Sequence, residues 1–185
     1  NLRSTVVNDF NYNSNNFISK MGFKNNFDLY FKNLNSVGKN DTIYTSNAQI
    51  DGMSILKVDS SFPLIRSKNM IKETLTPRVS FRINPGNNMD NYSSTTANIN
   101  ASNVFDINRL GLSNDFEAGR SLTFGLDYKF SKLENDQSEG TINKHLEFKL
   151  ATVLRDQNEN DIPISSTINK KNSDLFGSIN NQLFD

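Results

Sequence analysis

The sequence predicts an all-β fold, an antiparallel meander of about seven strands. The main observation is alternation of apolar and polar side chains, which runs along residues 75–84 and again along residues 121–130. A side-chain period of two gives a strand one apolar and one polar face. Each run is about ten residues long, enough for a tilted strand to cross the hydrocarbon of a bilayer. The same pattern fits a half-buried strand of a soluble sandwich, so other features must separate the two.

Composition favours a barrel with a wet interior. Hydrophobic residues make up 35% of the 185 residues, although 14 of these residues are phenylalanines. Low hydrophobicity is typical either of disorder or of a water-filled barrel, in which half of each strand is polar. The phenylalanines and the regular alternation argue against disorder. No stretch approaches the roughly eighteen uninterrupted apolar residues of a membrane helix.

Charge balance and missing residue types exclude several functional classes. The 20 basic and 20 acidic residues cancel, so the sequence lacks the excess of positive charge that is typical of nucleic-acid-binding proteins. The chain has no cysteine, which excludes disulfides and thiolate metal sites, and its only histidine, His145, excludes a histidine-rich metal site. No phosphate loop or nucleophile elbow is present. We therefore expect neither a cofactor nor an enzyme.

The predicted strands follow one another along the chain, separated by polar segments. They lie at residues 2–12, 16–33, 42–62, 75–84, 120–132, 144–156 and 174–184. Residues 63–70 are expected to form a turn, because Pro63 cannot donate a ladder hydrogen bond. Pro77, inside the fourth strand, indicates a strand edge or a bulge.

The connections alternate between short and long, and residues 84–118 form the longest of them. Outer-membrane barrels have short periplasmic turns and long extracellular loops. The alternation therefore predicts that residues 84–118 are an extracellular loop. Seven strands are too few for a large barrel, and the chain does not begin with Met, so we interpret residues 1–185 as a single partial barrel domain, an internal fragment with two open edges.

A series of motifs in residues 75–128 resembles a known family. Leu75 to Arg78 spell an L-x-P-R strand, residues 103–111 form an asparagine- and phenylalanine-containing loop that ends N-R-L-G, Glu117-Ala118-Gly119 is an acidic-x-Gly element, and a T-F-G strand follows. In this order the motifs resemble the barrel domain of the lipopolysaccharide-assembly outer-membrane family called LptD, or organic solvent tolerance protein. One departure is that Asn114-Asp115 stand where the family often has Asp-Arg.

The resemblance implies a fold, a function and partners. It implies a large transmembrane β-barrel in the outer membrane of a Gram-negative bacterium, which takes lipopolysaccharide from periplasmic bridge proteins and inserts it into the outer leaflet. It also implies a plug lipoprotein in the lumen, and contact with outer-membrane lipid. The family-motif residues that it marks in this chain are Pro77, Arg78, Phe105, Asn108, Arg109, Gly111, Glu117, Gly119, Thr123 and Gly125.

The polar faces of the strands supply candidate lumen residues, which are Arg78, Arg82, Asp127, Lys129, Glu147 and Lys149. Arg78 and Arg82 either pair with acidic neighbours on adjacent strands or bind an anionic glycolipid, because a guanidinium binds phosphate through two hydrogen bonds. Arg109 and Glu117 are placed to form a salt bridge that folds the long loop. Loop carboxylates such as Asp106 and Asp161 are either solvated charges or oxygen ligands for Ca²⁺.

Two other functions stay open. One is a passive porin or receptor-type outer-membrane barrel, which has no reason to carry the motif series of residues 75–125. The other is a soluble β-sandwich that binds carbohydrate, which requires an apolar core between two sheets. Facing is also testable by mutation: we expect arginine to be tolerated at Thr123, on the polar face, and not at Phe124, on the apolar face.

Overall fold

Nine antiparallel strands form one sheet in the computed structural model, which describes residues 2–42, 44–86, 98–111, 117–134, 141–160 and 162–182. The strands are β1 (Leu2–Asn13), β2 (Phe17–Ile18), β3 (Lys24–Lys39), β4 (Gln49–Ser61), β5 (Leu64–Lys68), β6 (Ile71–Asn84), β7 (Gly119–Glu134), β8 (Thr141–Arg155) and β9 (Phe176–Gln182). One 3₁₀ turn, η1 (Ile164–Ser166), is the only helical element of these residues. Within the described ranges, no helix has the length and apolar character needed to span a membrane.

The strand order is β1-β3-β4-β6-β7-β8-β9, with β2 paired to β3 and β5 paired to β6. Every pair is antiparallel, and each strand lies beside its neighbour in the chain or one short strand away. The all-β meander predicted from the sequence is therefore confirmed, with β1 and β9 as the two edges of the sheet. No second sheet packs against it in the part of the chain that the structure describes, so a sandwich core is not formed there.

Several predicted element boundaries are wrong, and local geometry explains the four largest differences. The predicted strand 16–33 is interrupted by a turn in which Gly22, at φ +88°, donates to the Ser19 carbonyl. The strand then continues as β3 to Lys39, through residues expected to form a polar loop, because β1 pairs with it along this whole stretch and β4 pairs with it as far as Ser36. The predicted strand from residue 42 begins only at Gln49.

The fourth difference is β5, which forms where a turn was expected. The turn itself is limited to Asn69 and Met70, both with positive φ, at 49° and 61°. Positive φ at both central residues is the geometry of a two-residue type I′ hairpin, whose twist matches that of the strands. The tight turn leaves residues 64–68 free to pair with β6.

Pro77 lies inside the sheet and not at its edge. β5 pairs with residues 71–75 of β6 and β4 pairs with residues 78–83, so Pro77 stands at the junction between them. Its carbonyl accepts a hydrogen bond from the Phe62 N–H, which places the missing proline donor on the same side as this junction. The ladder to β7, where Pro77 faces Leu126, therefore loses no hydrogen bond.

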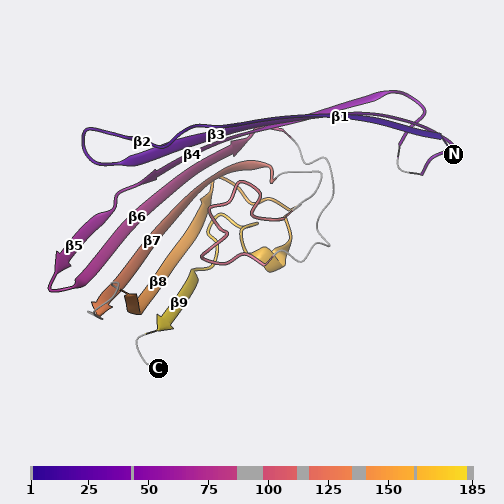
Figure 1. Ribbon diagram of the computed structural model, residues 1–185. Helices are drawn as coiled ribbons and strands as arrows, with labels where there is room; N and C mark the ends of the chain where they lie inside the picture. The colour runs from indigo at the N-terminus through magenta and orange to yellow at the C-terminus, as the bar shows by residue number, and fades with distance from the viewer. Residues whose placement is uncertain are drawn as a thin grey trace.

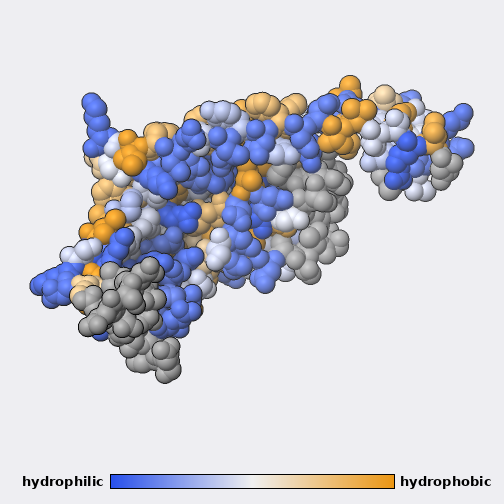
Figure 2. All heavy atoms as spheres, viewed as in Figure 1, coloured by the Kyte–Doolittle hydropathy of each residue, from blue (hydrophilic) through white to orange (hydrophobic). Residues whose placement is uncertain are grey.

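The sheet is curved, and the segments that follow β6 and β8 lie together on its concave side (Figure 1). We call the segment between β6 and β7 (residues 85–118) the first loop and the segment between β8 and β9 (residues 156–175) the second loop. β1, β3 and the start of β4 extend beyond these segments as a long projection (Figure 1). Hydrophilic residues cover most of the face turned to the viewer in Figure 2, and the tip of the projection stands apart as a small lobe. The largest buried cluster is not between two sheets but between the concave face and the two loops, and this is where the site lies.

Candidate functional site

Alternation divides the sheet into two faces, which we call the inner face, toward the loops, and the outer face. The six candidate lumen residues all share the inner face, as the cross-strand pairs Asp127↔Lys149, Lys129↔Glu147 and Arg78↔Gly125 show. The outer face carries mainly apolar side chains, among them Phe81, Ile83, Phe124, Tyr128, Phe148 and Leu150. The strand pattern thus sorts polar and apolar residues by face, as expected from the sequence.

An apolar cluster holds the two loops on the inner face. Its members are Ile99, Ala101, Val104, Phe105 and Leu110 from the first loop, Ala151 and Val153 from β8, Ile162 and Ile168 from the second loop, and Phe176 from β9. Every member is nearly or fully buried. The first loop also has local structure of its own, because the Asn100 side chain accepts hydrogen bonds from the Ser102 and Asn103 backbone.

The centre of the site is the carboxylate of Glu117, which is only 2% exposed. Arg109 holds it in a two-pronged pair, with Nε 2.7 Å from Oε2 and Nη2 2.5 Å from Oε1. The same guanidinium donates to the hydroxyls of Ser121, at 3.0 Å, and Thr123, at 3.1 Å, on β7. Burial lowers the pKa of Arg109 to about 9, so the guanidinium still carries its charge at neutral pH. The predicted salt bridge is present, and it also ties the loop to the strand.

Two more arginines reach Glu117 from distant strands. Arg155, at the end of β8, pairs with the Glu117 carboxylate and donates to the carbonyls of Ile168, at 2.6 Å, and Ala118, at 3.2 Å. Arg82 of β6 lies 3.5 Å from Glu117 Oε2. Through the three arginines, the Glu117 carboxylate links the first loop to β6, β7 and β8 and to the second loop. We call Glu117, Arg82, Arg109 and Arg155 the clamp.

Phe105 forms the second attachment of the first loop. Its ring lies over the backbone of Gly125, where an added Cβ atom would come within 2.6 Å of the ring. The Arg78 guanidinium stacks on the ring at 4.1 Å from its centroid and donates to Asp127 at 3.3 Å. A guanidinium over an aromatic face is a favourable cation–π contact. Gly125 thus provides the space and Arg78 the cover for one buried phenylalanine.

Two glycines of the motif series meet backbone requirements. Gly119 has φ +84°, and a Cβ there would strike the Glu159 carboxylate of the second loop. Gly111 has φ +65° at the end of the turn in which its N–H bonds to the Asn108 carbonyl, at 3.1 Å. Positive φ is the conformation that glycine adopts without steric cost.

Seven of the ten family-motif residues have contacts in this one site, and these are Arg78, Phe105, Arg109, Glu117, Gly119, Thr123 and Gly125. Asn108 and Gly111 form the turn at the end of the first loop, and Pro77 lies in β6 at the margin. Sequence reasoning missed Arg155 altogether, and it missed the contact of Arg82 with Glu117 in the clamp. Their distances along the chain from Glu117 leave no local signal. Thr123 is on the expected face, but it is 2% exposed beneath Arg109, so the expectation that arginine is tolerated there is wrong.

Outside the clamp, the inner face carries cross-strand ion pairs. Lys129 lies 2.8 Å from Glu147, and Arg78 pairs with Asp127. A polar groove of about 230 Å³ opens beside Phe105. Among the described residues, no group of acidic or histidine side chains is placed to hold a metal. Asn114, Asp115 and Asp161 lie outside the described residues.

Comparison with known proteins gives one match. The family model described as "LptD: LPS transport system D" matches residues 9–185. No curated protein and no solved structure matches the chain. The matched range includes every strand except the first residues of β1, as well as the clamp.

Proposed function

From the premise that this chain belongs to the LptD family, we propose that it is a wall segment of the barrel that inserts lipopolysaccharide into the outer leaflet of the outer membrane. The family acts in lipopolysaccharide transport and is an outer-membrane β-barrel family. The observation that supports the finer proposal is the two-faced sheet, in which an apolar outer face suits lipid and a charged inner face suits a water-filled lumen.

The length of the apolar band supports a membrane-spanning wall. On β7 the outer-face residues are apolar or aromatic from Leu122 to Phe130, and the band is bounded by Arg120 and Lys132. On β6 the corresponding band runs from Leu75 to Ile83. A span of about nine residues in a tilted strand matches the hydrocarbon thickness of a bilayer.

Loop position supports the orientation. The connections after β3, β6 and β8 lie at one end of the meander, and the turns at the other end are shorter, such as Asn69–Met70. In outer-membrane barrels the long loops are extracellular. Residues 84–118 are accordingly proposed as an extracellular loop that folds back onto the lumen wall.

We assign the clamp a mechanical role in this barrel. Buried ion pairs with several hydrogen bonds per partner hold their partners in one geometry. The clamp fixes both loops against the wall near the extracellular mouth, where they narrow the lumen. Passage of lipopolysaccharide then depends on the space beside the clamped loops, and the closed loops keep other solutes out.

Partners follow from the family and remain proposals for this segment. The plug lipoprotein would contact the polar inner face that the loops leave uncovered, where Lys129 and Glu147 are partly exposed. Periplasmic bridge proteins would deliver lipopolysaccharide at the short-turn end.

The two faces are tested by arginine at adjacent positions of β1. Phe10, on the outer face, is 56% exposed in this segment, and Asn11 beside it is an exposed inner-face residue. In the full-length protein, Phe10→Arg should cost about 2–4 kcal/mol if it faces the hydrocarbon, whereas Asn11→Arg should cost little. The measurements are heat-modifiable gel mobility and the sensitivity of cells to large antibiotics. Equal tolerance of both variants would overturn the proposal that the outer face meets lipid.

A further inference from the structure

The outer face carries a groove at its short-turn end, and none of its lining residues belongs to the clamp. The groove measures about 330 Å³ and lies between β5, β6 and β7. Its walls include Leu64, Leu75 and Tyr128, which lie side by side on β5, β6 and β7, because Leu75 pairs with Leu64 on one side and with Tyr128 on the other. Arg66 and Glu73 form the adjacent row. Apolar and charged walls therefore meet within one groove.

The polar side of the groove is held in place but still faces outward. Glu73 accepts hydrogen bonds from Arg66 Nε at 2.5 Å and from the Tyr128 hydroxyl at 3.0 Å. The Arg66 side chain is nevertheless 78% exposed, against 22% for Glu73. Glu73 thus engages one edge of the Arg66 guanidinium, through Nε and Nη2, while the N–H groups of Nη1 remain available to a ligand.

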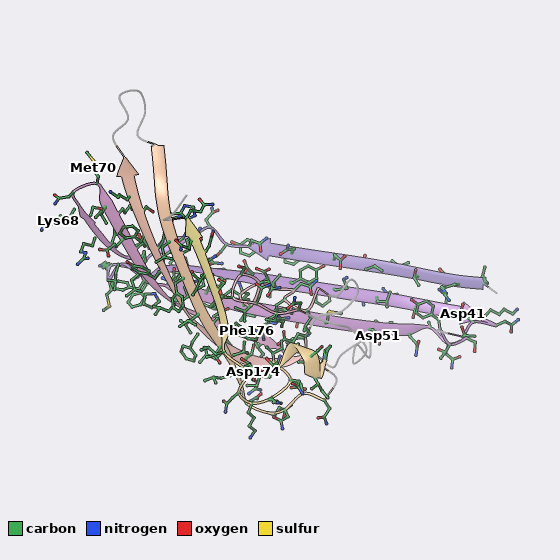
Figure 3. The ribbon with its side chains drawn as sticks, turned by 90° about the horizontal axis from the view of Figure 1, so that it is seen from below. Asp41, Asp51, Lys68, Met70, Asp174 and Phe176 are labelled. Atoms are coloured by element: carbon green, nitrogen blue, oxygen red, sulfur yellow. The ribbon has the colours of Figure 1, made fainter. Side chains whose placement is uncertain are left out.

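Two lysines add to the positive charge. Lys68 and Lys132 flank Ile71 in the last register row of the same face, and both are exposed. Neither lysine makes an ion pair in the described part of the chain. The positive charges of Arg66, Lys68 and Lys132 therefore exceed the single negative charge of Glu73. Figure 3 shows Lys68 and Met70 at the end of the sheet opposite to Asp41 and Asp51.

We propose that this groove binds an anionic glycerophospholipid of the periplasmic leaflet. Its phosphate would lie against Arg66, Lys68 and Lys132, and an acyl chain would follow Leu64 and Leu75 into the hydrocarbon. Guanidinium and ammonium groups at a membrane boundary attract anionic lipid heads, and a guanidinium can bind phosphate through two hydrogen bonds. The inference rests on the proposed function, because it requires the outer face to meet lipid and the short turns to be periplasmic.

The chain offers a matched control for charge. Arg120 lies on the same outer face at the other end of β7, opposite Ile83, and is also exposed. An arginine removed there changes the net charge equally but leaves the groove intact. Glu73→Gln supplies the opposite perturbation, since it removes the acid that competes with a phosphate for Arg66.

The test measures binding of dioleoylphosphatidylglycerol and dioleoylphosphatidylcholine to the full-length protein by native mass spectrometry. Arg66→Gln should weaken phosphatidylglycerol binding about five-fold, Arg120→Gln should leave it unchanged, and Glu73→Gln should strengthen it. Phosphatidylcholine binding should not respond to any of the three. Equal losses at Arg66 and Arg120 would indicate unspecific charge and overturn the inference.

Lipid A is the second probe, because it carries phosphate on sugar. If Arg66→Gln weakened lipid A binding and left phosphatidylglycerol binding unchanged, the groove would belong to the transported glycolipid and the inference would be wrong. Heat-modifiable mobility of each variant checks that the barrel is assembled. Failure here, with Phe10→Arg still damaging and Asn11→Arg tolerated, would remove the lipid site alone and leave the proposed function standing.

Discussion

The clamped half of the sheet and its projecting half are built from the same strand pattern but are stabilised differently. In the clamped half, β6, β7 and β8 bury side chains such as Val153 and Thr123 beneath two loops. In the projection, residues 2–7 of β1 are all exposed, and the strands are joined mainly by their ladders. Alternation alone specifies a strand, whereas loops that return to the sheet decide which strands acquire a core.

The largest expected effect is loss of the clamp acid. Glu117→Ala leaves three buried arginines without their shared carboxylate, and removal of one partner of a buried ion pair costs about 3–5 kcal/mol. We expect the loop at residues 98–111 to lose protection in hydrogen exchange and the cells to become sensitive to large antibiotics. The barrel itself should remain assembled, because the β6–β7 and β7–β8 ladders do not involve Glu117 side-chain contacts.

Glu147→Ala is the control for that experiment. Its partner Lys129 has a side chain that is 56% exposed, and surface pairs of this kind contribute at most about 1 kcal/mol. Loop protection should be unchanged in this variant. If both variants had the same small effect on the loop, the clamp would not hold it and the comparison between the two halves would lose its basis.

An intermediate effect is expected at the second attachment. Gly125→Val places a side chain where Phe105 now lies, and overpacking a buried site costs about 1–3 kcal/mol. Gly52, on the projecting side, is the matched position: an added Cβ meets only the Lys32 carbonyl, at 4.0 Å. Gly52→Val should therefore leave loop protection and antibiotic resistance unchanged. Hydrogen exchange of the loop in both variants measures the difference, and equal exchange would mean that Phe105 does not anchor the loop.

The sequence predicted the strands because alternation is a local property. It also predicted the Arg109–Glu117 pair, whose members are close in the chain. Arg82 and Arg155 could not be assigned to the clamp, since their strands are brought to Glu117 only by the pairing of β6 with β7 and of β7 with β8. The error at Thr123 has the same origin: alternation gives the face on which a residue lies, but not what covers that face.

The β5 hairpin and the length of β3 were missed for a different reason. Composition marked residues 35–41 and 63–70 as polar or proline-containing, which is a property of isolated loops. In the sheet, β1 pairs with β3 as far as Lys39 and β4 pairs with it as far as Ser36, and two positive-φ residues form the tight β5–β6 turn. Tertiary hydrogen bonds overrode local propensity at both places.

The smallest effect is expected at the tip of the projection, where Arg3 and Asp41 meet. Arg3 Nε donates to Asp41 at 3.1 Å and its guanidinium stacks over Tyr44, but the Arg3 side chain is 47% exposed. Solvent screens such a pair, so Arg3→Ala should cost at most about 1 kcal/mol. Asp41→Ala should cost more than Arg3→Ala, because Asp41 also accepts a hydrogen bond from the Tyr44 N–H, at 3.0 Å, that closes the turn. Hydrogen exchange at the tip measures both costs, and antibiotic sensitivity should not change in either variant. A cost for Arg3→Ala as large as that for Glu117→Ala would show that the projection, too, depends on a side-chain lock, and the contrast between the two halves would then be wrong.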